Sequence, residues 1–79
     1  MRVRLAGRLA AVFGAPGLAV ELPEGATVGD LLADLAERAP GAGAALAAAL
    51  PVVAGAHATR DHVLSPRQEV AVLLPVSGG

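Results

Sequence analysis

The sequence predicts an α+β domain in which a mixed sheet is covered on one face by a single main helix. Three observations predict this architecture: two alternating apolar segments near the start, one long amphipathic segment in the middle, and a further alternating segment near the end. A chain of 79 residues has room for one domain. We expect residues 1–74 to form that domain and residues 75–79 to form a flexible C-terminal tail.

The first predicted elements are short. Residues 2–6 alternate polar and apolar side chains, which predicts a strand with Val3 and Leu5 facing inward. Residues 8–13 are rich in alanine and predict one or two helical turns. Residues 18–22 alternate again and predict a second strand after a Pro-Gly turn.

The main helix is predicted to begin after Thr27. Thr27 and Asp30 have the spacing of a capping box, in which each side chain binds the backbone amide of the other residue. Pro40 and Gly41 end the helical pattern. The apolar residues between these limits recur on one helix face, which predicts burial against the sheet: Val28, Leu31, Leu32, Leu35 and Ala39.

The second half of the chain has weaker signals. Residues 43–50 are alanine-rich and predict a short helix ended by Pro51. Three strands are predicted further on, over residues 52–54, 62–64 and 69–74. In the last strand Ala71 and Leu73 face away from the core, so the uncovered sheet face is a candidate docking surface.

Composition excludes several classes of function. Six arginines against seven acids give a net charge of -1, and Phe13 is the sole aromatic residue, so the sequence has neither the basic surface nor the stacking residues of a nucleic-acid-binding protein. Cysteine is absent, which excludes disulfides and thiolate sites. No apolar stretch has the length of a membrane span or of a secretory leader, so we expect a cytoplasmic protein with no membrane partner.

No catalytic or metal-binding constellation is evident. His57, His62 and Asp61 do not have the spacing of a zinc site and are expected in a solvated loop. Ser65 and Ser77 lack a base in any triad-like arrangement. We therefore expect a protein that is not an enzyme alone, with no metal and no bound cofactor.

The closing segment, LLPVSGG, carries the most specific signal. Together with RLAAVFG and ELPEGATVGDLLADLAERAP, it resembles the MoaD/ThiS family of ubiquitin-like sulfur carriers along essentially the whole chain. Within the family the resemblance is greatest to the small subunits of molybdopterin synthase. Family members often have Asn-Gly after the inner strand, where this chain has Ala54-Gly55.

The resemblance implies a β-grasp fold and a reactive C-terminus. The carboxylate of Gly79 is expected to be adenylated and then converted to a thiocarboxylate, with Gly78 giving clearance in a partner's channel. An α-carboxylate is ionised at neutral pH and can attack the α-phosphorus of ATP. Tail and partner contacts are expected from the residues that precede the glycines: Leu73, Pro75, Val76 and Ser77. A frayed, functionless end is the plain alternative.

The implied partners are the large subunit of molybdopterin synthase, an E1-like adenylyltransferase that uses ATP, and a sulfur donor enzyme. Two other functions remain open on the sequence. One is a carrier of the same chemistry for thiazole, cysteine or tRNA thiolation. The other is a protein-interaction module or ubiquitin-like modifier that acts through the open sheet face.

Overall fold

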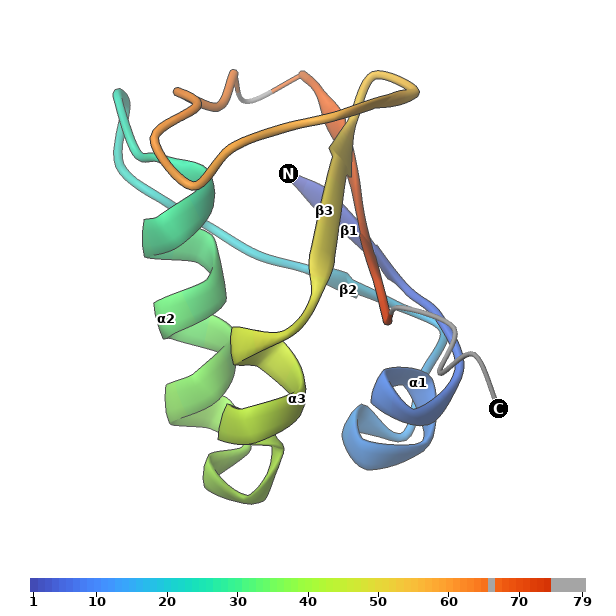
Figure 1. Cartoon of the computed structure of the whole chain (residues 1–79). Helices are drawn as coiled ribbons and strands as arrows, with labels where there is room; N and C mark the ends of the chain where they lie inside the picture. Colours follow the sequence, from blue (N-terminus) through green and yellow to red (C-terminus); the bar gives the residue numbers. More distant parts are fainter. Residues whose placement is uncertain (66, 75–79) are drawn as a thin grey trace.

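The computed structural model describes residues 1–65 and 67–74 and shows a five-stranded sheet packed against helices (Figure 1). The elements are β1 (Arg2–Leu5), α1 (Arg8–Phe13), β2 (Gly17–Ala19), α2 (Val28–Arg38), the 3-10 turn η1 (Pro40–Ala42), α3 (Gly43–Ala47), β3 (Leu50–Val53), β4 (Ala56–His57) and β5 (Glu69–Leu73). Across the sheet the strands lie in the order β2-β1-β5-β3-β4. The predicted α+β class is confirmed.

β1 and β5 run parallel to each other at the centre of the sheet. β2 flanks β1 and β3 flanks β5, each in antiparallel orientation, so the sheet is mixed as predicted. Side chains alternate between the two faces of each strand. One face enters the core through Val3, Leu5, Val70 and Val72, whereas the other carries Arg2, Arg4, Glu69 and Ala71.

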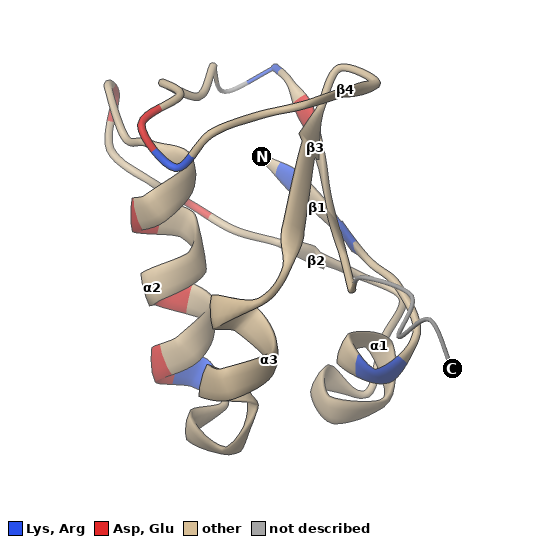
Figure 2. Ribbon diagram, in the orientation of Figure 1, with Lys and Arg blue, Asp and Glu red and all other residues tan. Residues whose placement is uncertain are grey.

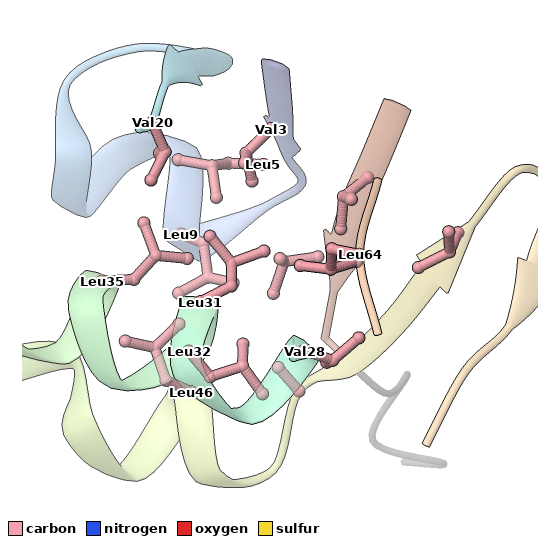
Figure 3. Close-up of a cluster of buried hydrophobic side chains, with 14 of the residues drawn as sticks. Val3, Leu5, Leu9, Val20, Val28, Leu31, Leu32, Leu35, Leu46 and Leu64 are labelled. Carbon is pink, nitrogen blue, oxygen red and sulfur yellow. The ribbon is translucent and has the colours of Figure 1, made fainter. Parts of the chain in front are cut away.

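The core is aliphatic and lies between the sheet and α2 (Figure 3). Leu31 and Leu35 of α2 are fully buried, and Leu9 of α1 and Leu46 of α3 extend the same cluster. Burial of each such leucine contributes about 1.5–3 kcal/mol. Among the described residues no polar or charged side chain is buried, so the core needs no hydrogen bonds between side chains.

α2 begins as the sequence predicts. The hydroxyl oxygen of Thr27 accepts a hydrogen bond from the amide of Asp30 at 3.2 Å, and a carboxylate oxygen of Asp30 accepts from the amide of Thr27 at 2.9 Å. These two bonds satisfy amides that a helix start leaves without intrahelical partners. The helix ends at Arg38, directly before Ala39 and Pro40.

The segment predicted as a strand over residues 62–64 is not a strand, and His62 at its start belongs to a segment that caps α2, residues 60–62, which we call the capping segment. Two first-turn amides of α2 donate to the carbonyl oxygens of His62 and Arg60, each at 2.9 Å. Val63 forms only an isolated bridge with Thr27. The strand prediction was wrong here because the backbone of this segment bonds to a helix terminus and not to a neighbouring strand.

β2 is shorter than predicted. It ends at Ala19, where the pattern predicted a strand over residues 18–22. Ala19 lies opposite Arg2, and beyond this pair the chain turns away toward the start of α2 (Figure 1). Val20 is nevertheless fully buried, so the alternation correctly identified a core residue that lies outside the strand.

Pro51 lies inside β3, although the sequence predicted that it ends a helix. It lies opposite Val72 of β5, and its carbonyl oxygen accepts a hydrogen bond from the amide of Ala58 at 3.0 Å. The backbone polar group of Pro51 therefore faces away from β5, and its missing N–H leaves the β3–β5 ladder intact. The helix predicted over residues 43–50 is shorter in the structure: α3 ends at Ala47, and β3 begins at Leu50.

A hairpin that the sequence analysis did not predict joins β3 to β4. Val53 lies opposite Ala56, which leaves Ala54 and Gly55 as the two turn residues. Their φ angles are 52° and 83°. Two positive φ angles are typical of a type I′ turn, which favours Asn-Gly. Because Ala54 has a Cβ atom, its left-handed backbone conformation costs roughly 1–2 kcal/mol.

Replacing the strained turn residue should stabilise the protein. We expect Ala54→Asn to raise the free energy of unfolding by about 0.5–1 kcal/mol, because asparagine tolerates positive φ better than alanine. Urea unfolding measures the change. Ala44→Asn, at an exposed position of α3, is the matched control and should lower the free energy of unfolding by a few tenths of a kcal/mol. Destabilisation by Ala54→Asn would contradict this account of the turn.

Gly29 is expected to be required for the contact between α2 and the capping segment. A Cβ atom at this position would lie 3.3 Å from the carbonyl oxygen of Arg60, which is held by the Gly29 amide at 2.9 Å. The Arg60 guanidinium also donates to the carbonyl of Ala47 at 2.7 Å, so the segment cannot retreat freely. Gly29→Ala should therefore lower stability by about 1 kcal/mol despite the higher helix propensity of alanine.

The control for this substitution is Gly41→Ala. A Cβ atom at Gly41 meets no heavy atom within 4 Å. We expect thermal unfolding of Gly41→Ala to match or exceed the wild type. Equal stability of the two variants would show that the close approach at Gly29 is unimportant.

Candidate functional site

Leu73, the first predicted site residue, is the last residue of β5 and is half-buried. Leu74 follows it and packs against the core. The other predicted site residues lie outside the described residues, and their predicted roles are not tested by the structure: Pro75, Val76, Ser77, Gly78 and Gly79. The described part of the candidate site is therefore the sheet around the end of β5.

This end of β5 is held by strands on both sides. Leu73 lies opposite Leu50 of β3, and Val72 lies opposite Leu5 of β1. The carbonyl oxygen of Val72 also accepts a hydrogen bond from the amide of Ala6 at 3.3 Å. The C-terminal segment therefore starts from the middle of the sheet and not from an edge strand.

The sheet face opposite α2, which we call the open face, changes character along the strands. Leu50 and Leu73 form an apolar pair at the end nearest to the C-terminal segment. One step further along, Ala71 lies between Arg4 of β1 and Val52 of β3. At the far end Arg2 and Glu69 lie opposite each other.

The ion pair between Arg4 and Glu69 lies at the centre of the open face. The guanidinium of Arg4 lies 3.2 Å from a carboxylate oxygen of Glu69, and the two side chains are 71% and 62% exposed. The pair is diagonal, because the direct neighbour of Arg4 across the strands is Ala71. Exposed pairs of this kind contribute little to stability, so both charges are available to other molecules.

The open face contains two residues that the sequence analysis missed. Leu50 was assigned to the end of a helix, and Val52 was taken as part of an inner strand without a role at the site. Both side chains lie on the open face, beside Leu73 and Ala71 of β5. Apolar residues at alternating positions on either side of Pro51 were the available signal, and the proline obscured it.

The residues considered for metal binding or nucleophilic chemistry lie apart from this site. His57, Asp61 and His62 are all exposed, as expected for a solvated position, although His57 belongs to β4. Ser65 is exposed in a turn, where its amide donates to the Gln68 side chain at 3.0 Å. Among residues 1–65 and 67–74, no group of three or more His, Asp or Glu side chains is arranged to hold a metal ion.

None of the helices in the described part of the chain combines the length and the apolar character needed to cross a membrane.

The central ion pair should be almost neutral for stability. We expect Arg4→Gln and Glu69→Gln each to change the free energy of unfolding by less than about 0.5 kcal/mol, because both groups are well exposed. Arg38→Gln removes a second pair, in which the Arg38 guanidinium lies 2.8 Å from Asp34, and should cost about 0.3–0.5 kcal/mol. A loss above about 1 kcal/mol for Arg4→Gln would assign the pair a structural role.

The sequence profile of the ThiS family matches residues 3–79 of the chain. A search among curated protein sequences gave no significant match. Solved structures show the same fold. SAMP1 from Haloferax volcanii is 27% identical, with a TM-score of 0.83 over 99% of this chain and 97% of its own. A putative molybdopterin converting factor, subunit 1, from Pyrococcus furiosus is 26% identical, with a TM-score of 0.85 over 95% of both chains.

The small archaeal modifier protein 1 from Methanosarcina acetivorans is 22% identical with a TM-score of 0.83, covers 99% of this chain and 94% of its own, and supports the fold alone. These neighbours have the ubiquitin-like β-grasp fold, so the predicted fold is confirmed. Because the family profile matches nearly every residue, we conclude that the chain belongs to the ThiS family of small ubiquitin-like sulfur carriers.

Proposed function

We propose that the chain is a sulfur carrier whose Gly79 carboxylate is adenylated, converted to a thiocarboxylate and used as the sulfur donor of a molybdopterin synthase, with this chain as the small subunit. The observation that carries the proposal is the family profile match, which extends through Gly78 and Gly79. The chain acts with partners and is not an enzyme alone.

The chemistry requires a carboxylate and an unhindered carbonyl carbon. A carboxylate oxygen of Gly79 attacks the α-phosphorus of ATP, and pyrophosphate leaves. Hydrosulfide supplied by the sulfur donor then attacks the carbonyl carbon of the acyl adenylate, AMP leaves, and the sulfur stays on the carbon as the thiocarboxylate. Glycine has no Cβ atom, so Gly79 exposes the carbonyl carbon and Gly78 lets the backbone pass through a narrow channel. Pro75, whose φ is restricted, favours an extended start of this segment.

The folded domain supports this proposal because it fixes the position of the residues directly before the reacting segment. β5 is paired with β1 and β3, and Leu74 packs against the core directly before Pro75. Leu73 and Leu50 lie on the open face at the same end of the sheet. A partner that binds this apolar pair is therefore placed beside the start of the segment that it has to receive.

The molybdopterin pathway is the finer part of the proposal. It is supported by the similarity to the putative molybdopterin converting factor, subunit 1, from Pyrococcus furiosus. The partners in this pathway are an E1-like adenylyltransferase that binds the ATP, a sulfur donor enzyme, and the large subunit of molybdopterin synthase. Carriers for thiazole, cysteine or tRNA thiolation use the same activated terminus and differ in the sulfur acceptor.

A second candidate function is protein modification. It is favoured by the similarity to SAMP1, a small archaeal modifier protein of Haloferax volcanii. Adenylation of Gly79 is common to both functions, but a modifier transfers its carbonyl carbon to an amine of a target protein and forms an amide. The acceptor of the acyl adenylate therefore separates the two candidates.

Intact mass spectrometry tests the carrier function. The protein is incubated with ATP, a sulfur donor and the E1-like enzyme of the same genome. The expected product has sulfur in place of one oxygen at Gly79. Formation of conjugates with other proteins, without any thiocarboxylate, would favour the modifier. An unchanged mass with no conjugates would overturn both.

Deletion of Gly79 should abolish thiocarboxylate formation and leave the unfolding transition unchanged. The reason is that Gly79 has no side chain to bury, and the core that the structure describes is built from side chains between Met1 and Leu74. Gly79→Ala should give a slower reaction, because a Cβ atom crowds the reacting carbon. Gly41→Ala is the matched control and should react like the wild type. A deletion variant that fails to fold would contradict the separation of domain and reactive segment.

A further inference from the structure

The charged residues are unevenly distributed: most arginines lie in one region of the molecule and most acids in another, although Arg38 and Arg60 lie among the acids on or beside α2 (Figure 2). Four of the six arginines belong to β1, to α1 or to the approach to β5: Arg2, Arg4, Arg8 and Arg67. Of the seven acids, only Glu69, the first residue of β5, lies with these arginines. The other six acids lie before, on or beside α2: Glu21, Glu24, Asp30, Asp34, Glu37 and Asp61. A net charge near zero therefore conceals a positive side and a negative side.

The open face belongs to the positive side. Arg2 and Arg4 both project from β1 onto this face. At the end of the face where Arg2 lies opposite Glu69, Arg67 and Arg2 line one hollow. Glu69 is paired with Arg4 at 3.2 Å. Among the described residues Arg2 forms no ion pair, although Glu69 lies directly opposite it in the sheet.

The surface around the central pair is hollowed and accessible. A hollow of about 370 Å³ lies on the β2 side of Arg4 and Glu69, where Pro16 and Gly17 also line it. A second one of about 370 Å³ lies on the β3 side, where Ala71 and Gly55 leave space. Arg4 and Glu69 line both hollows and Arg2 lines the first, so a group on another protein can reach Arg4 from either side and Arg2 from the β2 side.

We propose that an acidic surface on the adenylating enzyme recognises the open face, and that carboxylates of this surface bind Arg2 and Arg4. Glu69 binds Arg4 within the chain and therefore competes with these carboxylates. This inference rests on the proposed carrier function and identifies the chemistry of its partner. The apolar pair Leu50–Leu73 lies on the reactive-segment side of the contact. The arginines lie further along the strands, so the two features together set the orientation of docking.

Electrostatic complementarity of this kind acts mainly on the rate of encounter and on orientation. Removal of an arginine should therefore raise the KM for the carrier and leave kcat unchanged. Removal of Glu69 should lower the KM, because Arg4 is then free to bind the partner. Both effects should diminish at high salt, since ions screen exposed charges.

ATP–pyrophosphate exchange by the E1-like enzyme of the same genome provides the test, with the carrier concentration varied at low and high salt. At low salt we expect Arg4→Gln to lower kcat/KM by about fivefold to tenfold. Arg38→Gln, which also removes an arginine from an ion pair, is the matched control and should stay within about twofold of the wild type.

Replacement of an acidic residue on the open face should change kcat/KM in the opposite direction. Glu69→Gln should raise kcat/KM by about twofold to fivefold, whereas Glu37→Gln, with the same change in net charge but on α2, should leave it unchanged. If Arg4→Gln and Glu69→Gln behave like their controls, the acidic-partner proposal is wrong and the carrier function stands. If both variants weaken activation, the intact pair is recognised and competition by Glu69 is overturned. If the wild type supports no exchange, the carrier function fails and this inference fails with it.

Discussion

The parallel pairing of β1 with β5 is the constraint on which the rest of the structure depends. It brings the first strand of the chain beside the last, so that Val3 and Val70 and then Leu5 and Val72 line one face of the sheet centre. The same register places Arg2 opposite Glu69 on the other face. One set of backbone hydrogen bonds therefore determines both the centre of the core and the charged centre of the candidate docking surface.

The helix layer completes the core on one side and leaves the other side free. α2 buries its leucines against β1 and β5, and its first turn is held by the capping box and by carbonyls of the 60–62 segment. With so few large side chains, a domain of this size has one core and one covered sheet face. The opposite face is available for function because the fold does not need it for burial.

The open face has an apolar end and a charged end that lie close together on the same strands. Its apolar end lies beside the start of the C-terminal segment, and its charged end lies further along β1 and β5. The four residue-to-residue steps from Leu73 back to Glu69 correspond to roughly 13 Å along the strand. A partner that matches both ends can bind in only one orientation, which the proposed transfer at Gly79 would require.

The local sequence determined the elements whose signals lie within a few neighbouring residues. The capping box of Thr27 and Asp30, the leucine stripe of α2 and the alternation of β1 and β5 are all present as predicted. Such signals are reliable because helix capping and side-chain alternation depend on local backbone geometry. The resemblance carried by the closing residues likewise identified the family, as the profile match confirms.

Tertiary structure decided the features that depend on which strand or helix lies alongside. Pro51 is tolerated in β3 because its missing N–H faces away from β5, and residues 60–62 cap α2 because the carbonyl oxygens of Arg60 and His62 meet its first turn. Ala54 adopts a positive φ because the pairing of Val53 with Ala56 leaves two residues for the turn. The Arg4–Glu69 pair joins residues at opposite ends of the chain. Such contacts follow from the register of the assembled sheet, which no short stretch of sequence specifies.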